Sequence, residues 1–350
     1  HSVSINLGLY RRRLVEITKS MVVNIKSSKT LLYCAVFLSI LLITSVNIVT
    51  SYLYIAGPLK SRTVILLQHG LSINEVSNLL AESNIIQYPR FFAIISKLYS
   101  LHQPLQNGEY DFTDGISPIQ VIRKLASGKS IIHRIIIQEG MTVNEIIDIV
   151  NNEKLLDGTI STPIPEGYLM PSTYFYSYGD KRENLIDKMR LEMSIALDEV
   201  MHKLPNSSPL KSRKDVLILA SIISKEAGHD DERGKIAAVF INRLKKNMKL
   251  QACPTVVYAL TEGKYKLGRA LTKTDLKTPS PYNTYYTLGL PPGAIACPSK
   301  KSLEAVVNPV KTDALYFVVN GSGGHNFSKT FDEHNQHITN LKQCFKQVDP

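Results

Sequence analysis

Glu226 is the residue whose type and position best suit acid–base chemistry. It ends an apolar segment predicted to be helical, Lys214 to Glu226, and it follows Ile222 by four residues and Ile223 by three. At this spacing its side chain projects from the same helix face as the apolar side chains. A carboxyl group on such a face loses hydration, which raises its pKa and lets it act as a general acid near neutral pH.

A plainer interpretation of Glu226 stays open at this point. A glutamate near a helix end commonly extends into water or pairs with a neighbouring cation, here Lys225 or Arg233. Judged from these residues alone, this structural role is favoured over the catalytic one.

Three segments after Glu226 are dense in Pro, Tyr, Asn and Thr: Lys249 to Val256, Pro279 to Tyr286 and Gly289 to Gly293. Such loops present amide and hydroxyl groups on a stiff frame beside aromatic faces, as a glycan groove requires. The chain has 17 Tyr and no Trp, so tyrosine must supply any sugar-stacking surface. A rigid surface loop that binds nothing explains the same composition.

Other chemistries have weaker support. Gly321 to Gly324 lacks the Lys-Ser/Thr pair of a phosphate-binding loop, and a hairpin turn explains it better. His325, His334 and His337 fit no standard set of zinc ligands. Ser-His-Asp catalysis lacks a nucleophile-elbow sequence. We therefore expect neither a metal nor a cofactor.

The formal net charge of +11 suggests nucleic-acid binding until the positions of the charges are considered. The first 60 residues hold seven Lys and Arg against one Glu, a net of +6, which leaves +5 for the other 290 residues. The larger part of the chain is thus only mildly basic, and we expect no nucleic-acid partner.

The basic end is followed by an apolar segment that predicts a membrane anchor. No charged residue occurs between Lys29 and Lys60, and a transmembrane helix is expected from about residue 31 to 55, preceded by a basic tail over 1–30. A buried core helix or a cleaved signal peptide would have a shorter apolar segment. Because six Lys and Arg precede the segment, the positive-inside rule places the N-terminus in the cytoplasm and residues 60–350 across the membrane.

Four cysteines without C-x-x-C spacing argue against a zinc ribbon or a thioredoxin-like site. Cys34 falls within the apolar segment. If Cys253, Cys297 and Cys344 face an oxidising compartment, one pair could be bridged, and free thiols are an equally open alternative.

Three capping boxes predict helices over 72–82, 117–126 and 142–152, and β-rich runs precede the first and the third. Residues 61–158 therefore read as small strand-then-helix units, and the Pro-rich segment from Thr162 to Tyr174 follows the expected domain boundary. Further helices are predicted over 181–203, 214–226, 231–246, 299–307 and 331–345, with a strand over 315–320. The C-terminal domain should be mainly helical with a small sheet.

The C-terminal half resembles a known family, the YceG-like endolytic murein transglycosylases (MltG). Six ordered blocks carry the resemblance: Glu166 to Tyr174, Ala220 to Glu226, Val239 to Leu244, Leu250 to Val256, Tyr282 to Tyr285 with Gly289 to Gly293, and Tyr316 to Val318 with Gly324 to Ser328. The membrane anchor and total length agree with it, and it extends over about residues 31–345.

The resemblance implies an α+β protein: the transmembrane helix, a small LysM-like α+β module over 61–158, and a catalytic domain over 159–346. The implied enzyme is a lytic transglycosylase of the bacterial inner membrane, with its catalytic domain in the periplasm. It cleaves the MurNAc-β-1,4-GlcNAc bond of nascent peptidoglycan without water and leaves 1,6-anhydro ends, which limits strand length during cell-wall synthesis. Glycan strands and the inner membrane are its implied partners, and peptidoglycan synthases are candidate ones.

By the same resemblance Glu226 is the catalytic acid/base. The residues implied to line the glycan groove are Gln251, Thr255, Tyr282, Asn283, Thr284 and Tyr285. The alternative is a non-catalytic, peptidoglycan-binding scaffold of the elongation or division machinery.

The chain departs from the family pattern at four positions. Ser224 stands where a further Glu is common, and Ser172 and Cys253 stand where Asp is usual. Cys297 replaces a polar residue, which leads to the hypothesis of a Cys253–Cys297 disulfide beside the groove.

Overall fold

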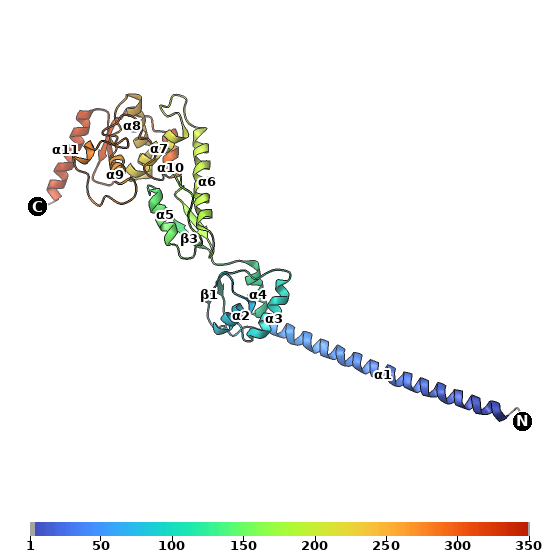
Figure 1. The fold of residues 1–350 in the computed structure, drawn as a ribbon. Helices are drawn as coiled ribbons and strands as arrows, with labels where there is room; N and C mark the ends of the chain where they lie inside the picture. The colour runs from blue at the N-terminus through green and yellow to red at the C-terminus, as the bar shows by residue number, and fades with distance from the viewer. Residues whose placement is uncertain (1–3, 349–350) are drawn as a thin grey trace. The chain divides into compact units, whose positions relative to one another are not determined.

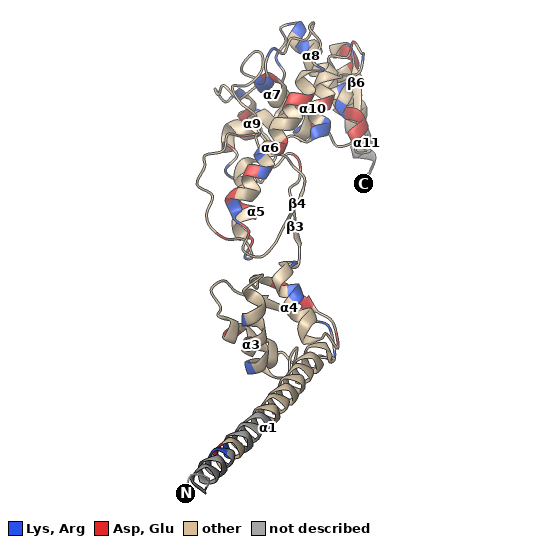
Figure 2. Cartoon of the chain, turned by 90° about the vertical axis from the view of Figure 1, so that its right-hand side faces the viewer, with Lys and Arg blue, Asp and Glu red and all other residues tan. Residues whose placement is uncertain are grey.

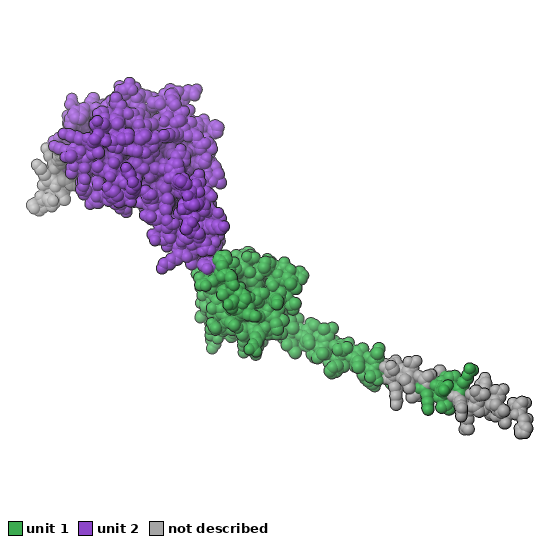
Figure 3. Space-filling model, in the orientation of Figure 1, with its two compact units in different colours: residues 1–130 green, residues 131–350 purple. Residues whose placement is uncertain are grey.

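The computed structural model of the chain describes residues 4–348, and the side chains of residues 13, 15–19 and 29–341. Contacts divide the chain into two compact units, residues 1–130 and 131–350 (Figure 3). The architecture is mixed, with helices and small two-stranded sheets, in agreement with the α+β prediction.

The first element is the long helix α1 (Ser4–Tyr54) (Figure 1). Its segment from Lys29 to Tyr54 has a mean hydropathy of 2.3 and is not buried in the protein, so it is long and apolar enough to cross a membrane. Beyond Lys29, α1 carries no Lys, Arg, Asp or Glu (Figure 2). The apolar helix thus covers the span predicted from residue 31, and α1 also continues through the basic segment.

The remainder of the first unit holds a two-stranded sheet and helices. β1 (Thr63–Leu67) and β2 (Gly108–Phe112) are antiparallel, with Thr63 opposite Phe112. The helices of this part are α2 (Ile73–Glu82), α3 (Pro89–Ser100) and α4 (Pro118–Ser127). Their buried side chains, among them Leu80, Phe92 and Leu125, form one core with the sheet.

The capping boxes at the starts of α2 and α4 are confirmed. α3 was not predicted, because its N-cap, Tyr88, makes no side-chain capping bond, and Pro89 alone marks the start of the helix. β2 was not predicted, because its sequence, Gly-Glu-Tyr-Asp-Phe, lacks the run of β-branched and apolar residues that marks β1, which has the same length.

The second unit begins with a strand whose partner in the sheet follows the Pro-rich segment. β3 (His133–Ile136) pairs antiparallel with β4 (Thr173–Tyr176), with α5 (Val143–Asn152) between them in the chain. Thr142 and Glu145 form the expected capping box of α5, and the Pro-rich segment contains no helix. Because β3 and β4 pair with each other, residues 131–158 belong to the same compact unit as the C-terminal helices.

Helix α7 lies within a group of helices in the second unit. They are α6 (Arg182–Met201), α7 (Arg213–Glu226), α8 (Arg233–Lys245), α9 (Cys253–Thr261) and α10 (Lys300–Val307) (Figure 1). α7 contacts the other four, and every residue from Val216 to Ser224 is buried. All these helices except α9 were predicted to within a few residues. α9 begins inside a segment that we expected to be a loop, with Pro254 in its first turn.

The chain closes with a hairpin and a helix. β5 (Tyr316–Val319) and β6 (His325–Ser328) pair antiparallel, and α11 (Phe331–Val348) follows. Short 3₁₀ helices, η1 (Asp230–Glu232) and η2 (Asp275–Lys277), precede α8 and the second of the Tyr- and Pro-rich loops.

Candidate active site

Glu226 is the last residue of α7, and its position follows from the burial of that helix. Ser212 starts α7 with a capping box to Asp215, and the helix ends where Ala227 adopts an extended conformation. The side chain of Glu226 is half-buried and lines a cavity of about 370 Å³. The C-terminal end of the buried helix thus delivers one carboxyl group to a cavity.

The cavity is formed by segments that are distant in the sequence. Its walls come from α7, α8, the loop before α9, the β5–β6 hairpin and the start of α11. The lining residues are Glu226, Arg243, Leu250, Gln251, Cys253, Tyr285, Tyr316, Phe317, Val318, Val319, His325, Phe331 and His334. Among these residues Glu226 is the only carboxylic acid.

Burial raises the pKa of Glu226 to about 7. The two cations that could have paired with it have other partners: Lys225 donates to the carbonyl of Gly140 at 3.1 Å, and Arg233 pairs with Glu139 and Asp230. Within the described part of the chain, no hydrogen bond or ion pair to the Glu226 carboxyl is found. The structure therefore favours the catalytic interpretation, because the group is desolvated, uncompensated and open to a cavity.

Glu166 provides an informative contrast. Burial also raises its pKa to about 7, but its carboxylate accepts hydrogen bonds from the backbone N–H groups of Val143 and Gly167, at 2.9 and 3.2 Å. Glu166 does not line the Glu226 cavity. Its contacts instead join the start of α5 to the Pro-rich segment, so this buried carboxyl has a structural explanation.

Gln251 and Tyr285 are the two predicted groove residues that line the cavity with Glu226. The Gln251 backbone N–H donates to the carbonyl of Thr284 at 3.1 Å, and its φ of 50° lies in the left-handed region. The Tyr285 N–H donates to Oδ1 of Asn283 at 2.9 Å, and burial raises the pKa of the Tyr285 hydroxyl. Two separate loops are thus joined so that both side chains reach one cavity.

The other four predicted groove residues lie outside this cavity lining. Thr255, Asn283 and Thr284 are fully buried, and Oγ1 of Thr255 is 2.8 Å from Oγ1 of Thr284. The Asn283 side chain donates to the carbonyls of Leu276 and Thr278, at 3.1 and 2.8 Å.

Tyr282, the fourth of these residues, packs against Tyr258, with their ring centroids 4.8 Å apart. These side chains hold the loops in place, and none of the four contributes a surface to the cavity.

The hypothesis of a Cys253–Cys297 disulfide is wrong. Both are free thiols: Cys253 is exposed at the start of α9, whereas Cys297 is buried in a core with residues of β3, β4 and α5. The Cys253 sulfur lies 3.2 Å from the Tyr285 hydroxyl instead. The two thiols point into different parts of the unit, and the side chain of Cys344 lies outside the described residues.

Arg243, Tyr316 and His325 line the cavity but were missed as members of the site. Arg243 is buried and donates to the carbonyls of Leu250 and Leu315, at 2.7 and 2.6 Å, and its guanidinium lies 5.1 Å from the centre of the Tyr316 ring. His325 we considered only as a metal ligand. Their positions inside two of the family blocks were the available signal.

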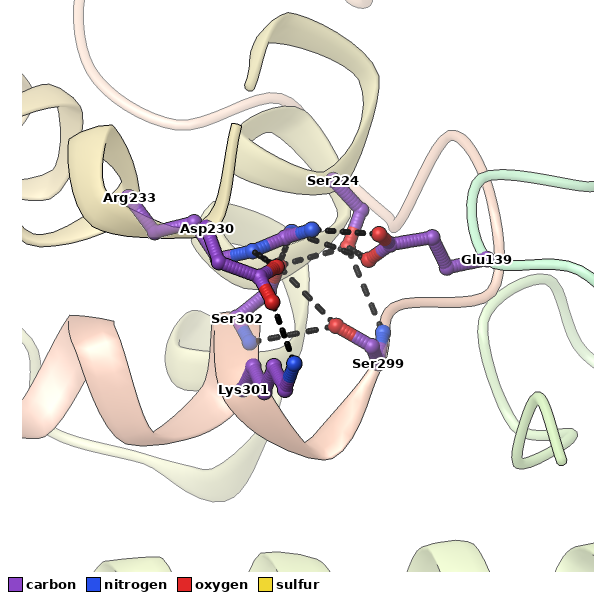
Figure 4. Close-up of polar contacts among 7 residues, drawn as sticks. All are labelled: Glu139, Ser224, Asp230, Arg233, Ser299, Lys301 and Ser302. Atoms are coloured by element: carbon purple, nitrogen blue, oxygen red, sulfur yellow. Dashed lines mark hydrogen bonds and ion pairs between the residues drawn. The ribbon is translucent and has the colours of Figure 1, made fainter. Parts of the chain in front are cut away.

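A polar cluster fixes the last turn of α7 (Figure 4). Its members, the Arg233 cluster, are Glu139, Ser224, Asp230, Arg233, Ser299, Lys301 and Ser302. Nη1 of Arg233 lies 2.9 Å from Oε2 of Glu139 and 2.7 Å from the Ser302 hydroxyl, which Ser224 contacts at 2.7 Å. Ser224 is thus bonded inside this cluster, two residues before the carboxyl that lines the cavity.

The described residues contain no group of three or more His, Cys, Asp or Glu placed to hold a metal ion. The cavity offers one carboxylic acid with a raised pKa, one buried guanidinium, tyrosine hydroxyls, an amide, a thiol and two histidine rings. This set suits proton transfer to and from a neutral, hydroxyl-rich substrate.

Comparison with known proteins decides the family. The model of the YceG-like family matches residues 65–340. The chain belongs to the YceG-like family. The resemblance drawn from the sequence blocks is thereby confirmed.

YceG-like relatives carry a specific activity in their names. An endolytic murein transglycosylase of Bacillus subtilis (strain 168) is 33% identical over 309 residues, covering 79% of this chain and 84% of the relative. A protein of the same name from Streptococcus pneumoniae serotype 2 (strain D39 / NCTC 7466) is 26% identical over 341 residues, covering 83% of this chain and 60% of the relative. A crystal structure of a yceG-like protein from Listeria monocytogenes is 31% identical, with a TM-score of 0.51 over 79% of this chain and 98% of that one.

Proposed function

We propose that this chain is an endolytic murein transglycosylase, a lyase that cleaves peptidoglycan glycan strands with Glu226 as its acid and base. The observation that carries the proposal is a single unpaired carboxyl, with its pKa raised to about 7, in a cavity lined by no other Asp or Glu. A two-carboxylate glycosidase needs a second acid about 5 to 9.5 Å away as nucleophile or water activator. One group is enough when the substrate itself supplies the attacking hydroxyl.

The reaction follows from one carboxyl used twice. Protonated Glu226 donates its proton to the glycosidic oxygen between MurNAc and GlcNAc, and the C1–O bond breaks. The resulting carboxylate takes the proton from the C6 hydroxyl of MurNAc while that oxygen bonds to C1. The products are a GlcNAc hydroxyl and a 1,6-anhydro-MurNAc end, Glu226 is protonated again, and no water is consumed.

We place the glycan against Gln251 and Tyr285, whose amide and hydroxyl groups share the cavity with Glu226. The loops that carry these two side chains are held in place by the hydrogen bonds and ring contact described above, which involve Thr255, Asn283, Thr284 and Tyr282. Supporting residues of this kind hold contacting groups in a productive geometry.

The membrane arrangement belongs to the same proposal. The apolar segment Lys29–Tyr54 supports a single-pass anchor, and the six Lys and Arg before it support a cytoplasmic N-terminus with the catalytic unit in the periplasm. Of the LysM-like module expected over 61–158, residues 61–130 belong to the first compact unit, and we propose that this part brings the enzyme to glycan. Synthases that extend the same strands are the partners this arrangement would serve.

The test is digestion of nascent peptidoglycan by the full chain in detergent, with mass spectrometry of the products. Wild type should give anhydro-ended fragments, and Glu226→Gln should give none while still binding glycan. Reducing-end products would indicate a hydrolytic muramidase, and glycan binding without any cleavage by wild type would indicate a scaffold.

A further inference from the structure

A histidine and a carboxylate in contact with each other lie at the edge of the Glu226 cavity. His325, the first residue of β6, lines the cavity, and its Nδ1 lies 2.8 Å from Oε2 of Glu232. The backbone N–H of His325 donates to the other carboxylate oxygen of Glu232 at 2.6 Å. The two side chains are only 8% and 10% exposed, so one buried carboxylate holds both the ring and the backbone of this histidine.

The turn before His325 is shaped around that carboxylate. A Cβ atom on Gly324 would lie 2.8 Å from Oε1 of Glu232, and one on Gly323, whose φ is +91°, would lie 3.0 Å from the His229 ring. Oδ1 of Asn320 accepts from the Gly324 N–H at 3.0 Å and holds the turn. The absence of a side chain at Gly324 therefore makes room for the Glu232 carboxylate, which a hairpin turn alone would not require.

The contact with Glu232 fixes the chemistry of the ring. Burial raises the pKa of Glu232, but the hydrogen bonds from the side chain and backbone of His325, together with the charge attraction of His325 and His229, lower the pKa overall. An ionised carboxylate only accepts hydrogen bonds, so Nδ1 of His325 carries a proton, and the neutral ring has its lone pair on Nε2. Nε2 is then a hydrogen-bond acceptor, and it has no partner among the described residues.

The apolar neighbours keep the ring in one orientation. Phe317 packs edge-on against His325, with the ring centroids 5.3 Å apart and the planes at 87°. Phe317 lines the same cavity. Because Nδ1 contacts Glu232 and Phe317 packs against the ring, Nε2 is the ring nitrogen available to a bound molecule.

We propose that His325 is a second residue of this site that contacts the glycan, with Nε2 accepting a hydrogen bond from a sugar hydroxyl or acetamido N–H, and that Glu232 is the residue that positions it. The inference rests on the proposed function and deepens it. No proton is transferred in this contact, and Glu226 remains the acid and base.

Two substitutions of His325 separate this role from a purely structural one. In His325→Asn the side-chain N–H₂ can still donate to Glu232, but no acceptor reaches the position of Nε2. In His325→Gln the amide oxygen can reach the position of Nε2, but the contact with Glu232 is weakened. We expect kcat/KM to fall about tenfold or more in H325N, with a melting temperature near that of wild type, and to fall less in H325Q.

Glu232→Gln provides the positioning test. In this variant the oxygen of the introduced amide can accept from the His325 backbone N–H only if the amide N–H₂ group faces Nδ1. Nδ1 must then accept, so the ring proton moves to Nε2. Nε2 can no longer accept a hydrogen bond from the glycan. We expect E232Q to lower kcat/KM by about 10- to 100-fold, and E232Q combined with H325N to be little worse than either alone.

The measurements use the full chain in detergent with nascent peptidoglycan as substrate. Initial rates give kcat and KM, and glycan affinity is measured in the E226Q background, where no cleavage occurs. An H325N variant with wild-type rate and unchanged glycan affinity, beside a damaged H325Q, would overturn the role of His325. Cleavage by wild type and its loss in E226Q would still stand in that case, so failure of this inference is distinguishable from failure of the proposed function.

Discussion

Arg233 at the start of α8 holds Glu139 in the loop before α5 through both ends of its guanidinium group. The Arg233 side chain is 7% exposed and that of Glu139 is 32% exposed. Through Ser302 and Ser224 the same arginine reaches the last turn of α7 (Figure 4). One buried cation thus connects three segments that meet near the Glu226 end of α7.

Removal of Arg233 should destabilise the catalytic unit. Arg233→Met leaves Glu139 unpaired and largely buried, and we expect a loss of about 2 to 4 kcal/mol in the free energy of unfolding. The matched control is Arg213→Met, because Arg213 pairs with Asp198 at 2.8 Å with both side chains about half exposed. That change should cost below about 1 kcal/mol. Chemical denaturation of the two variants decides this, and equal losses would contradict the prediction.

Activity should depend on pH through Glu226. The carboxyl must be protonated to act as the acid, and its pKa is about 7. We therefore expect kcat/KM to fall about tenfold per pH unit above that value. A pH–rate profile between pH 5 and 9, as suggested by this pKa, is the measurement. A profile that stays flat to pH 9 would show that Glu226 is not the group that titrates.

The same pKa predicts an effect on stability. The folded chain keeps the Glu226 proton up to a pH of about 7, whereas the unfolded chain loses it near 4.5, so between these values folding binds a proton and stability falls as pH rises. Above a pH of about 7 the loss in the free energy of unfolding caused by ionised Glu226 stays constant. Glu226→Gln should therefore stabilise the chain by about 1 to 3 kcal/mol above neutral pH and have little effect below pH 4.5. Melting temperatures at both ends of this range test it; a difference between the proteins that is independent of pH would refute it.

Gln251 should show a separation of activity from stability. Its left-handed φ of 50° costs a non-glycine residue about 1 to 2 kcal/mol. Gln251→Gly relieves this strain and removes the amide from the cavity, so we expect equal or higher stability and a loss of activity of about tenfold. Glu262→Gly is the control, since Glu262 has a φ of 51° at the exposed end of α9 and should gain stability without losing activity.

The cysteines should differ in reactivity. Cys253 is exposed at the cavity, whereas Cys297 is buried and its burial raises the pKa of the thiol. A maleimide should modify Cys253 in the native protein and Cys297 only after unfolding. Peptide mass mapping identifies the sites. Recovery of a Cys253–Cys297 bridged peptide from non-reduced protein would contradict the free thiols of the structure.

Local patterns were enough to predict most of the helices and to mark Glu226 as a candidate acid. The capping boxes at Ser72, Ser117 and Thr142 open the helices they predicted, and the apolar segment before Glu226 forms a buried helix. Helix starts and apolar faces depend on residues within one or two turns, so the sequence displays them directly. α3 and α9 lack a side-chain cap, so their starts are marked only by a proline in the first turn.

The assembly of the cavity required the tertiary structure. Thr255 and Thr284 belong to loops whose composition suits glycan binding. Their hydroxyl oxygens, however, lie 2.8 Å from each other, and both residues are fully buried. Long-range packing also decided that Cys253 and Cys297 lie in different surroundings, and that Glu232 meets a histidine 93 residues later. The sequence alone was enough to place Glu226 on the apolar face of a helix and so to mark it as a candidate acid, because the signals for that helix and face are local. Which side chains surround that acid depends on contacts between distant segments, and only the folded chain decides those.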